Sequence, residues 1–68
     1  MTQIVRIAEV RKAHGMTQEQ LEAASGVHRV TIARYESGAL SPTVRNLEKI
    51  AAALGVTAAE LIDRVDGQ

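Results

Sequence analysis

Apolar residues recur at three- and four-residue intervals along most of this 68-residue chain, which is the spacing of one face of an α-helix. Glycines and capping residues divide the pattern into separate segments. The segments predict five helices, at about residues 3–13, 18–25, 29–36, 44–54 and 58–65. The predicted fold class is therefore all-α, a compact five-helix bundle that forms a single domain over residues 1–68.

Capping and turn signals mark where these helices begin and end. Two stretches have the capping-box pattern of a threonine followed three residues later by Gln or Glu, namely Thr17–Gln20 and Thr57–Glu60. Thr43 is expected to cap the fourth helix. Gly26 supplies the left-handed backbone of a sharp turn. Residues 17–38 thus predict a helix-turn-helix, a motif whose second helix commonly reads DNA.

Composition excludes several classes of function. Aromatic residues are nearly absent and cysteine is absent, so we expect an aliphatic core without disulfides or thiolate metal sites. His14 and His28 are far apart in sequence and no glycine-rich phosphate loop is present, so we expect no enzyme, metal or cofactor. No apolar run approaches the roughly 20 residues of a membrane span, and no signal peptide is visible. We expect a cytoplasmic protein.

The charge of the chain is sorted along its length. The net charge is zero, whereas nucleic-acid-binding domains are usually basic. Residues 28–45 nevertheless contain three Arg and one Glu, a local charge of +2, whereas residues 46–68 contain two basic and four acidic residues, a local charge of −2. The positive segment includes the second helix of the motif, where contact with DNA would require it.

Short motifs in a fixed order resemble the Cro and phage-repressor type of helix-turn-helix regulators, also called the xenobiotic response element family. The stretches that carry the resemblance are Gly15–Leu21, Ser25–Val27, Thr31–Gly38, Pro42-Thr43 and Leu47–Val56. The resemblance extends from about Ile7 to Leu61. It implies a lambda-repressor-like bundle, sequence-specific binding of double-stranded DNA and regulation of transcription, in a bacterial or phage-encoded protein.

The resemblance also implies roles for individual residues. Four residues match positions whose side chains reach base edges in the major groove: His28, Arg29, Val30 and Arg34. Five polar residues around the starts of the second and fourth helices match positions that bind backbone phosphate: Thr17, Gln18, Ser41, Thr43 and Arg45. Arg11 and Glu36 match an ion pair that joins the first helix to the third.

Two positions depart from this pattern. Glu22 stands where the family favours Ala, at the crossing of the two motif helices. It could point outward, pair with a basic residue such as Arg29, open the crossing or change the binding preference. His28 stands where Ser, Thr or Asp would normally cap, either as a functional position or as a tolerated imperfection. Tyr35, the single aromatic, could stack on a base, but its three-residue spacing from Ile32 favours the core.

Partners follow from the same resemblance. We expect a homodimer on a palindromic operator, with half-sites about 34 Å apart. Three apolar residues of the fifth helix either form the dimer contact or close the core: Leu61, Ile62 and Val65. The alternative function is a protein-interaction module such as an antitoxin, which binds a toxin, and the neutral charge and Glu22 favour it. A structural bundle with a vestigial motif agrees less well with the capping and turn signals.

Overall fold

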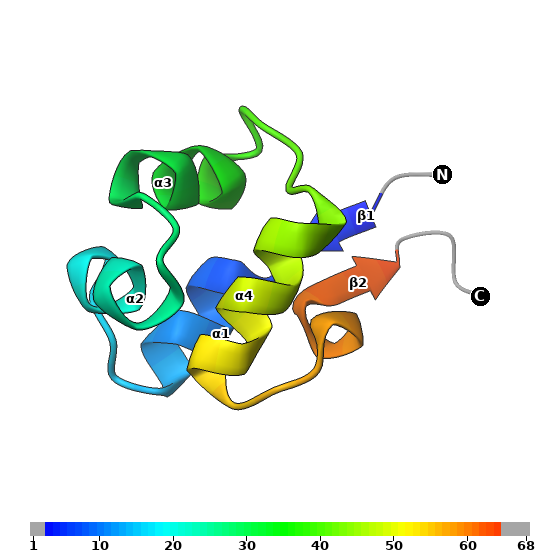
Figure 1. Ribbon diagram of the computed structural model, residues 1–68. Helices are drawn as coiled ribbons and strands as arrows, with labels where there is room; N and C mark the ends of the chain where they lie inside the picture. Colours follow the sequence, from blue (N-terminus) through cyan, green and yellow to red (C-terminus); the bar gives the residue numbers. More distant parts are fainter. Residues whose placement is uncertain (1–2, 65–68) are drawn as a thin grey trace.

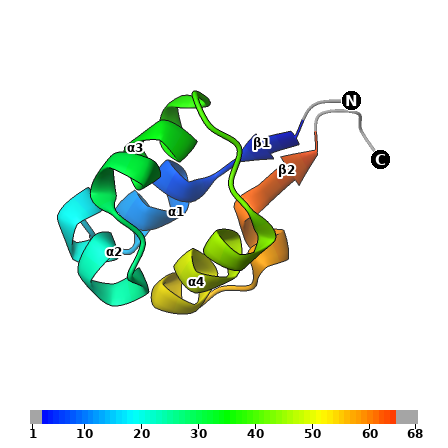
Figure 2. The same ribbon diagram turned by 45° about the horizontal axis from the view of Figure 1, so that its top comes forward.

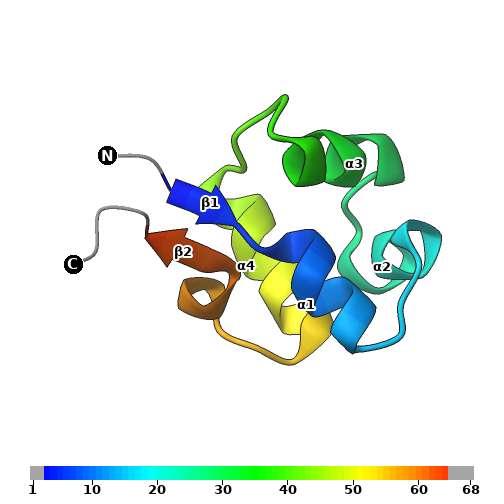
Figure 3. The ribbon, with the colours of Figure 1, turned by 180° about the vertical axis from the view of Figure 1, so that it is seen from behind.

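The computed structural model of the chain describes residues 3–64 (Figure 1). Its elements, in chain order, are β1 (Gln3–Val5), α1 (Ile7–Ala13), α2 (Gln18–Ser25), α3 (Arg29–Ser37), α4 (Val44–Leu54), the 3-10 helix η1 (Ala58–Leu61) and β2 (Ile62–Arg64). The helix-turn-helix is formed by α2 and α3, and α1 and α4 pack beside it. The two strands lie side by side at the end of the molecule opposite α2 (Figures 1, 2 and 3).

The prediction of five α-helices is wrong at both ends of the chain. Residues 3–5 form β1 and α1 begins only at Ile7, while residues 58–61 make one 3-10 turn and residues 62–64 form β2. The strands pair antiparallel, with Val5 opposite Ile62. Two reasons favour the extended form: β-branched residues suit strands, and pairing satisfies backbone groups that either segment alone would leave open. Val65 lies outside the described residues.

The motif helices begin and end where their capping chemistry places them. Thr17 Oγ1 accepts the Gln20 N–H at 3.0 Å, and Gln20 Oε1 accepts the Thr17 N–H at 2.8 Å, so the predicted capping box is present. Gly26 ends α2 with a φ of +79°, in the left-handed region that favours glycine. Thr43 Oγ1 accepts the Asn46 N–H at 3.1 Å and starts α4.

Replacing Thr17 with Ala is expected to lower the free energy of unfolding by about 1 kcal/mol, because the first turn of α2 loses the hydroxyl that accepts its N–H group. Urea unfolding followed by circular dichroism measures this. Thr17→Ser keeps the hydroxyl and is the matched control. An equal loss in both variants would show that the cap is not the cause.

One aliphatic core receives a side chain from each of the four α-helices. Its buried members are Ile7, Leu21, Val27, Ile32, Tyr35, Leu47, Ile50, Ala51, Leu54 and Leu61. Tyr35 belongs to it, with only 4% of its surface exposed, and its hydroxyl accepts a hydrogen bond from Asn46 Nδ2 at 2.8 Å. Tyr35 therefore joins α3 to α4 and is not placed to stack on a base.

Candidate nucleic-acid interface

One face of helix α3 packs against the core, and the opposite face is exposed to solvent. Ile32 and Tyr35 are its two buried residues. The four candidate base-contacting residues are all exposed: His28, Arg29, Val30 and Arg34. Figure 1 shows α3 at the outer edge of the molecule, with α2 beside it and α4 toward the centre. The sequence thus makes an amphipathic helix whose polar face is open to a large ligand.

His28 does cap α3, despite its unusual residue type. Its Nδ1 accepts the Val30 N–H at 3.1 Å. Because Nδ1 is an acceptor, the ring hydrogen of the neutral side chain belongs on Nε2. That atom lies 4.0 Å from Glu22 Oε2. The side chain of His28 is 65% exposed, so it can serve the helix and still reach a ligand.

Helix α2 supplies carboxylates to the start of α3. Of the alternatives considered for Glu22, the structure shows a position beside a basic residue, but that residue is His28 and not Arg29. The partner of Arg29 is Glu19, whose Oε2 accepts a hydrogen bond from Arg29 Nη1 at 3.1 Å. Glu19 was not predicted from the sequence, because a contact between residues ten apart depends on how the two helices cross.

The candidate phosphate-binding residues occupy the starts of α2 and α4 and the loop before α4. Thr17, Ser41, Thr43 and Arg45 are exposed. The two threonine hydroxyls accept backbone N–H groups within the chain, and each keeps its own hydrogen to donate to a phosphate. Gln18 is half-buried, and its Nε2 donates to Glu36 Oε1 at 2.9 Å.

The expected ion pair of Arg11 and Glu36 is present and is bidentate. Arg11 Nε lies 2.7 Å from Glu36 Oε2, and Arg11 Nη2 donates to Glu36 Oε1 at 3.1 Å. Arg11 Nη1 also donates to the Met16 carbonyl at 2.8 Å. Only 10% of the Arg11 side chain and 9% of the Glu36 side chain are exposed. This cluster ties α1, the start of α2 and the end of α3 together.

The same cluster decides the ionisation of Glu36. Burial raises the pKa of its carboxyl group, but the hydrogen bonds from Arg11 and Gln18 and the positive charge of Arg11 outweigh burial, so the pKa is lowered overall. The hydrogen bond to Glu36 raises the pKa of Arg11 against the opposing effect of burial. Both groups are therefore charged at neutral pH, and Gln18 is anchored to a carboxylate.

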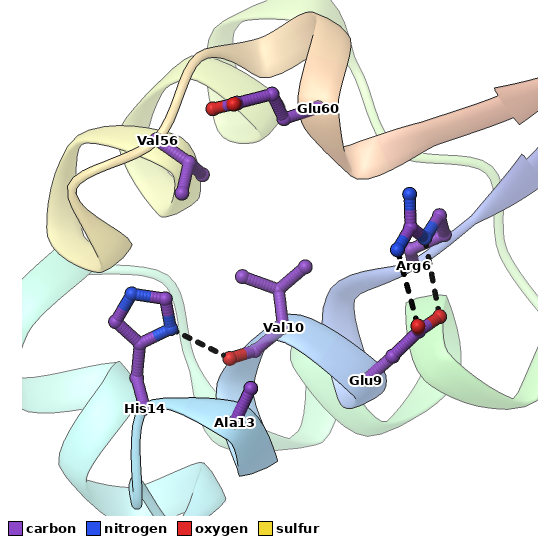
Figure 4. Close-up of a pocket in the computed structure, with 7 residues that line it drawn as sticks. All are labelled: Arg6, Glu9, Val10, Ala13, His14, Val56 and Glu60. Carbon is purple, nitrogen blue, oxygen red and sulfur yellow. Dashed lines mark hydrogen bonds and ion pairs between the residues drawn. The ribbon is translucent and has the colours of Figure 1, made fainter.

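A shallow hollow of about 330 Å³ lies outside the motif, between α1 and the segment from α4 to η1 (Figure 4). It is lined by Arg6, Glu9, Val10, Ala13, His14, Val56 and Glu60. Its polar groups make bonds within the chain: Glu9 pairs with Arg6, and His14 Nδ1 lies 2.9 Å from the Val10 carbonyl (Figure 4). Glu60 accepts the Thr57 N–H. None of these lining residues belongs to α3, so the hollow is separate from the exposed face of that helix.

Within residues 3–64, no group of three or more His, Cys, Asp or Glu side chains could hold a metal ion. No helix in the same range is long and apolar enough to cross a membrane. The exposed face of α3, with the starts of α2 and α4, is the candidate interface.

The sequence profile of the helix-turn-helix family matches residues 7–61, which cover the motif and both helices that pack beside it. The chain belongs to the Cro/C1-type helix-turn-helix family. This family consists of DNA-binding transcriptional regulators and is not an enzyme family. The family predicted from sequence is thereby confirmed.

Individual relatives agree with this membership. Over 59 residues, the chain is 41% identical to y4dJ of Sinorhizobium fredii, an uncharacterized HTH-type transcriptional regulator, covering 87% of this chain and 77% of that protein. It is 42% identical over 59 residues to the cryptic phage CTXphi transcriptional repressor RstR of Vibrio cholerae, covering 87% of this chain and 53% of RstR. The chain therefore spans about half the length of that repressor.

A solved structure supports the fold of this helix-turn-helix protein. The restriction-modification controller protein C.AhdI from Aeromonas hydrophila superposes with a TM-score of 0.79 at 36% sequence identity, covering 82% of this chain and 85% of that chain. The helix-turn-helix fold predicted from sequence is thus shared with this controller protein, although the five-helix count is not confirmed. The protein is a DNA-binding transcriptional regulator.

Proposed function

We propose that this regulator binds a specific double-stranded DNA sequence by placing α3 in the major groove. The observation that carries the proposal is the division of α3 into two faces. Ile32 and Tyr35 fix one face to the core, while Arg29, Val30 and Arg34 leave the other face open. The major groove of B-DNA admits an α-helix, and its base edges carry a distinct pattern for each base pair.

Each exposed side chain of α3 suits a particular base edge. The guanidinium groups of Arg29 and Arg34 can donate two hydrogen bonds to guanine O6 and N7. Val30, which is 48% exposed, can contact the methyl group of thymine. His28 lies at the edge of this set, where its Nε2 can donate to a base or to a phosphate.

Phosphate contacts would fix the register of α3 in the groove. The residues in question are Thr17, Gln18, Ser41, Thr43 and Arg45, all at or next to the starts of α2 and α4. Helix N-termini attract anions because their first N–H groups point outward and the helix dipole is positive there. Such contacts position the protein without reading sequence.

A palindromic operator and a homodimer complete the proposal, because a two-fold pair presents two copies of α3 one DNA turn apart. Leu61 is fully buried in the core of its own chain, and Ile62 is half-buried in β2, so these side chains mainly close the core. Leu40, in the loop from α3 to α4, and Val44, the first residue of α4, are 45% and 72% exposed and are better placed to meet a second copy. We place this dimer in the cytoplasm of a bacterium, as a host or phage gene product.

The alternative of an antitoxin or other interaction module has less support. The relatives reported above are named as transcriptional regulators, a repressor and a controller protein. Glu22, the residue that favoured the alternative, is accounted for by its position beside His28.

Replacing Arg34 with Ala is expected to weaken binding to a duplex selected from a random pool by about 1–3 kcal/mol and to relax specificity at one base pair of each half-site. The reason is the loss of one bidentate hydrogen-bond contact to guanine O6 and N7. Binding constants for the selected duplex and its single-base variants, at a stated salt concentration, measure both effects.

Arg45→Ala is the matched control for Arg34, since it removes the same side chain from a candidate phosphate contact. It should weaken all duplexes alike and reduce the salt slope by about 1. If Arg34→Ala also weakens selected and scrambled duplexes by the same factor, Arg34 does not read a base.

A further inference from the structure

An acidic side chain of α2 lies against the guanidinium group at the start of α3. Glu19 Oε2 and Arg29 Nη1 are 3.1 Å apart, with 71% of the Glu19 side chain and 54% of the Arg29 side chain exposed. Glu19 lies in the first turn of α2, directly after Thr17 and Gln18. A carboxylate is therefore placed among the groups proposed to meet DNA phosphates, where its charge is unfavourable for binding.

The pair leaves Arg29 able to read a base. Within residues 3–64 only Nη1 of Arg29 is bonded to Glu19, so Nε and Nη2 keep N–H groups that can meet guanine O6 and N7. The carboxylate also neutralises the guanidinium group and repels phosphate. Arg34 forms no ion pair within the same residues. The two arginines therefore differ, because only the charge of Arg29 is partly neutralised by a carboxylate.

We propose that Glu19 is a specificity-determining residue that acts through Arg29. It holds the guanidinium group for base contact and lowers the affinity of the surface for DNA phosphates in general. Non-specific binding depends almost entirely on phosphate attraction, so the carboxylate weakens it more than it weakens the complex in which Arg29 meets its base. Discrimination between specific and non-specific DNA then comes from repulsion between Glu19 and phosphates as well as from attraction between Arg29 and its base. The proposal rests on the proposed function, in which α3 enters the major groove.

The test compares Glu19→Gln with Glu48→Gln, which makes the same charge change at an exposed residue of α4. Dissociation constants are measured for the selected and a scrambled duplex at several salt concentrations. We expect Glu19→Gln to tighten binding to the scrambled duplex about two- to five-fold and to tighten the selected duplex less, so the specificity ratio falls. The salt slope for the scrambled duplex should steepen by about 0.9, because Arg29 gains one phosphate. Glu48→Gln should change neither quantity.

A double-mutant cycle separates positioning from plain charge. In an Arg29→Ala background, Glu19→Gln should leave the specificity ratio unchanged, because the positioned group is gone. The proposal is overturned if the ratio still falls in that background, or if Glu19→Gln and Glu48→Gln act alike. It is also overturned if Arg29→Ala keeps the wild-type ratio, while base contact by Arg34 would then still stand. Failure to select any duplex overturns the proposed function itself.

Discussion

Replacing Arg11 with Met is expected to lower the free energy of unfolding by about 3–5 kcal/mol, because it leaves the Glu36 carboxylate buried without its counter-ion. Among residues 3–64, the Glu36 side chain, which is 9% exposed, would keep the hydrogen bond from Gln18 at 2.9 Å and the more distant charge of Lys12. A domain of this size has a total stability of about 3–10 kcal/mol, so much of the protein would unfold. Urea unfolding followed by circular dichroism measures the loss.

The double variant Arg11→Met with Glu36→Leu is the control for this loss. Removing both charges takes away the unpaired carboxylate, so the double variant should be more stable than Arg11→Met alone. A single variant within about 1 kcal/mol of the wild type would contradict the account, since it would mean that Glu36 needs no partner.

The pH dependence of stability provides a second measure of the same cluster. The pKa of Glu36 is lowered in the folded protein, so ionised Glu36 adds to the free energy of unfolding. This contribution is full above the ordinary Glu pKa of about 4.3 and is lost as the pH falls through the pKa of Glu36 in the folded protein. Without Arg11, burial is opposed only by the hydrogen bond from Gln18 and the charge of Lys12, so the pKa of Glu36 should rise and Arg11→Met should lose less stability on acidification than the wild type. Parallel pH profiles for the two proteins would contradict this.

Replacing Ile32 with Ala is expected to cost about 2–5 kcal/mol, the range for removing a fully buried aliphatic side chain. The effect should also reach DNA binding, because Ile32 and Tyr35 are the two buried side chains that hold α3. Thermal and urea unfolding measure the stability, and binding to the selected duplex measures the effect on α3.

Ile32→Val is the graded control for this position, with an expected cost of about 0.5–1.5 kcal/mol. It should retain binding to the selected duplex, since most of the packing against α3 remains. An Ile32→Ala protein as stable as Ile32→Val would mean that α3 is held mainly by other contacts.

The middle of the chain was predictable because its signals are local. The capping box at Thr17, the left-handed turn at Gly26 and the cap at Thr43 each depend on residues within a few positions of one another. The exposed and buried faces of α3 follow from the spacing of Ile32 and Tyr35, which the periodicity of one helix predicts.

The ends of the chain were not predictable in the same way. Apolar residues at three-residue spacing suited a helix over residues 3–13 and 58–65. What stabilises β1 is its pairing with β2, with Val5 opposite Ile62, and that contact joins segments almost sixty residues apart. The same limit applies to Glu19 and Arg29, whose contact depends on how α2 crosses α3.

The placement of α3 against DNA is tested most directly by mapping backbone amide resonances while the selected duplex is added. We expect the largest changes at residues 28–34 and at the starts of α2 and α4, near Thr17 and Thr43. Amides around the hollow, at Val10, Ala13 and Val56, should change little. Largest changes around that hollow, with α3 unaffected, would contradict the account.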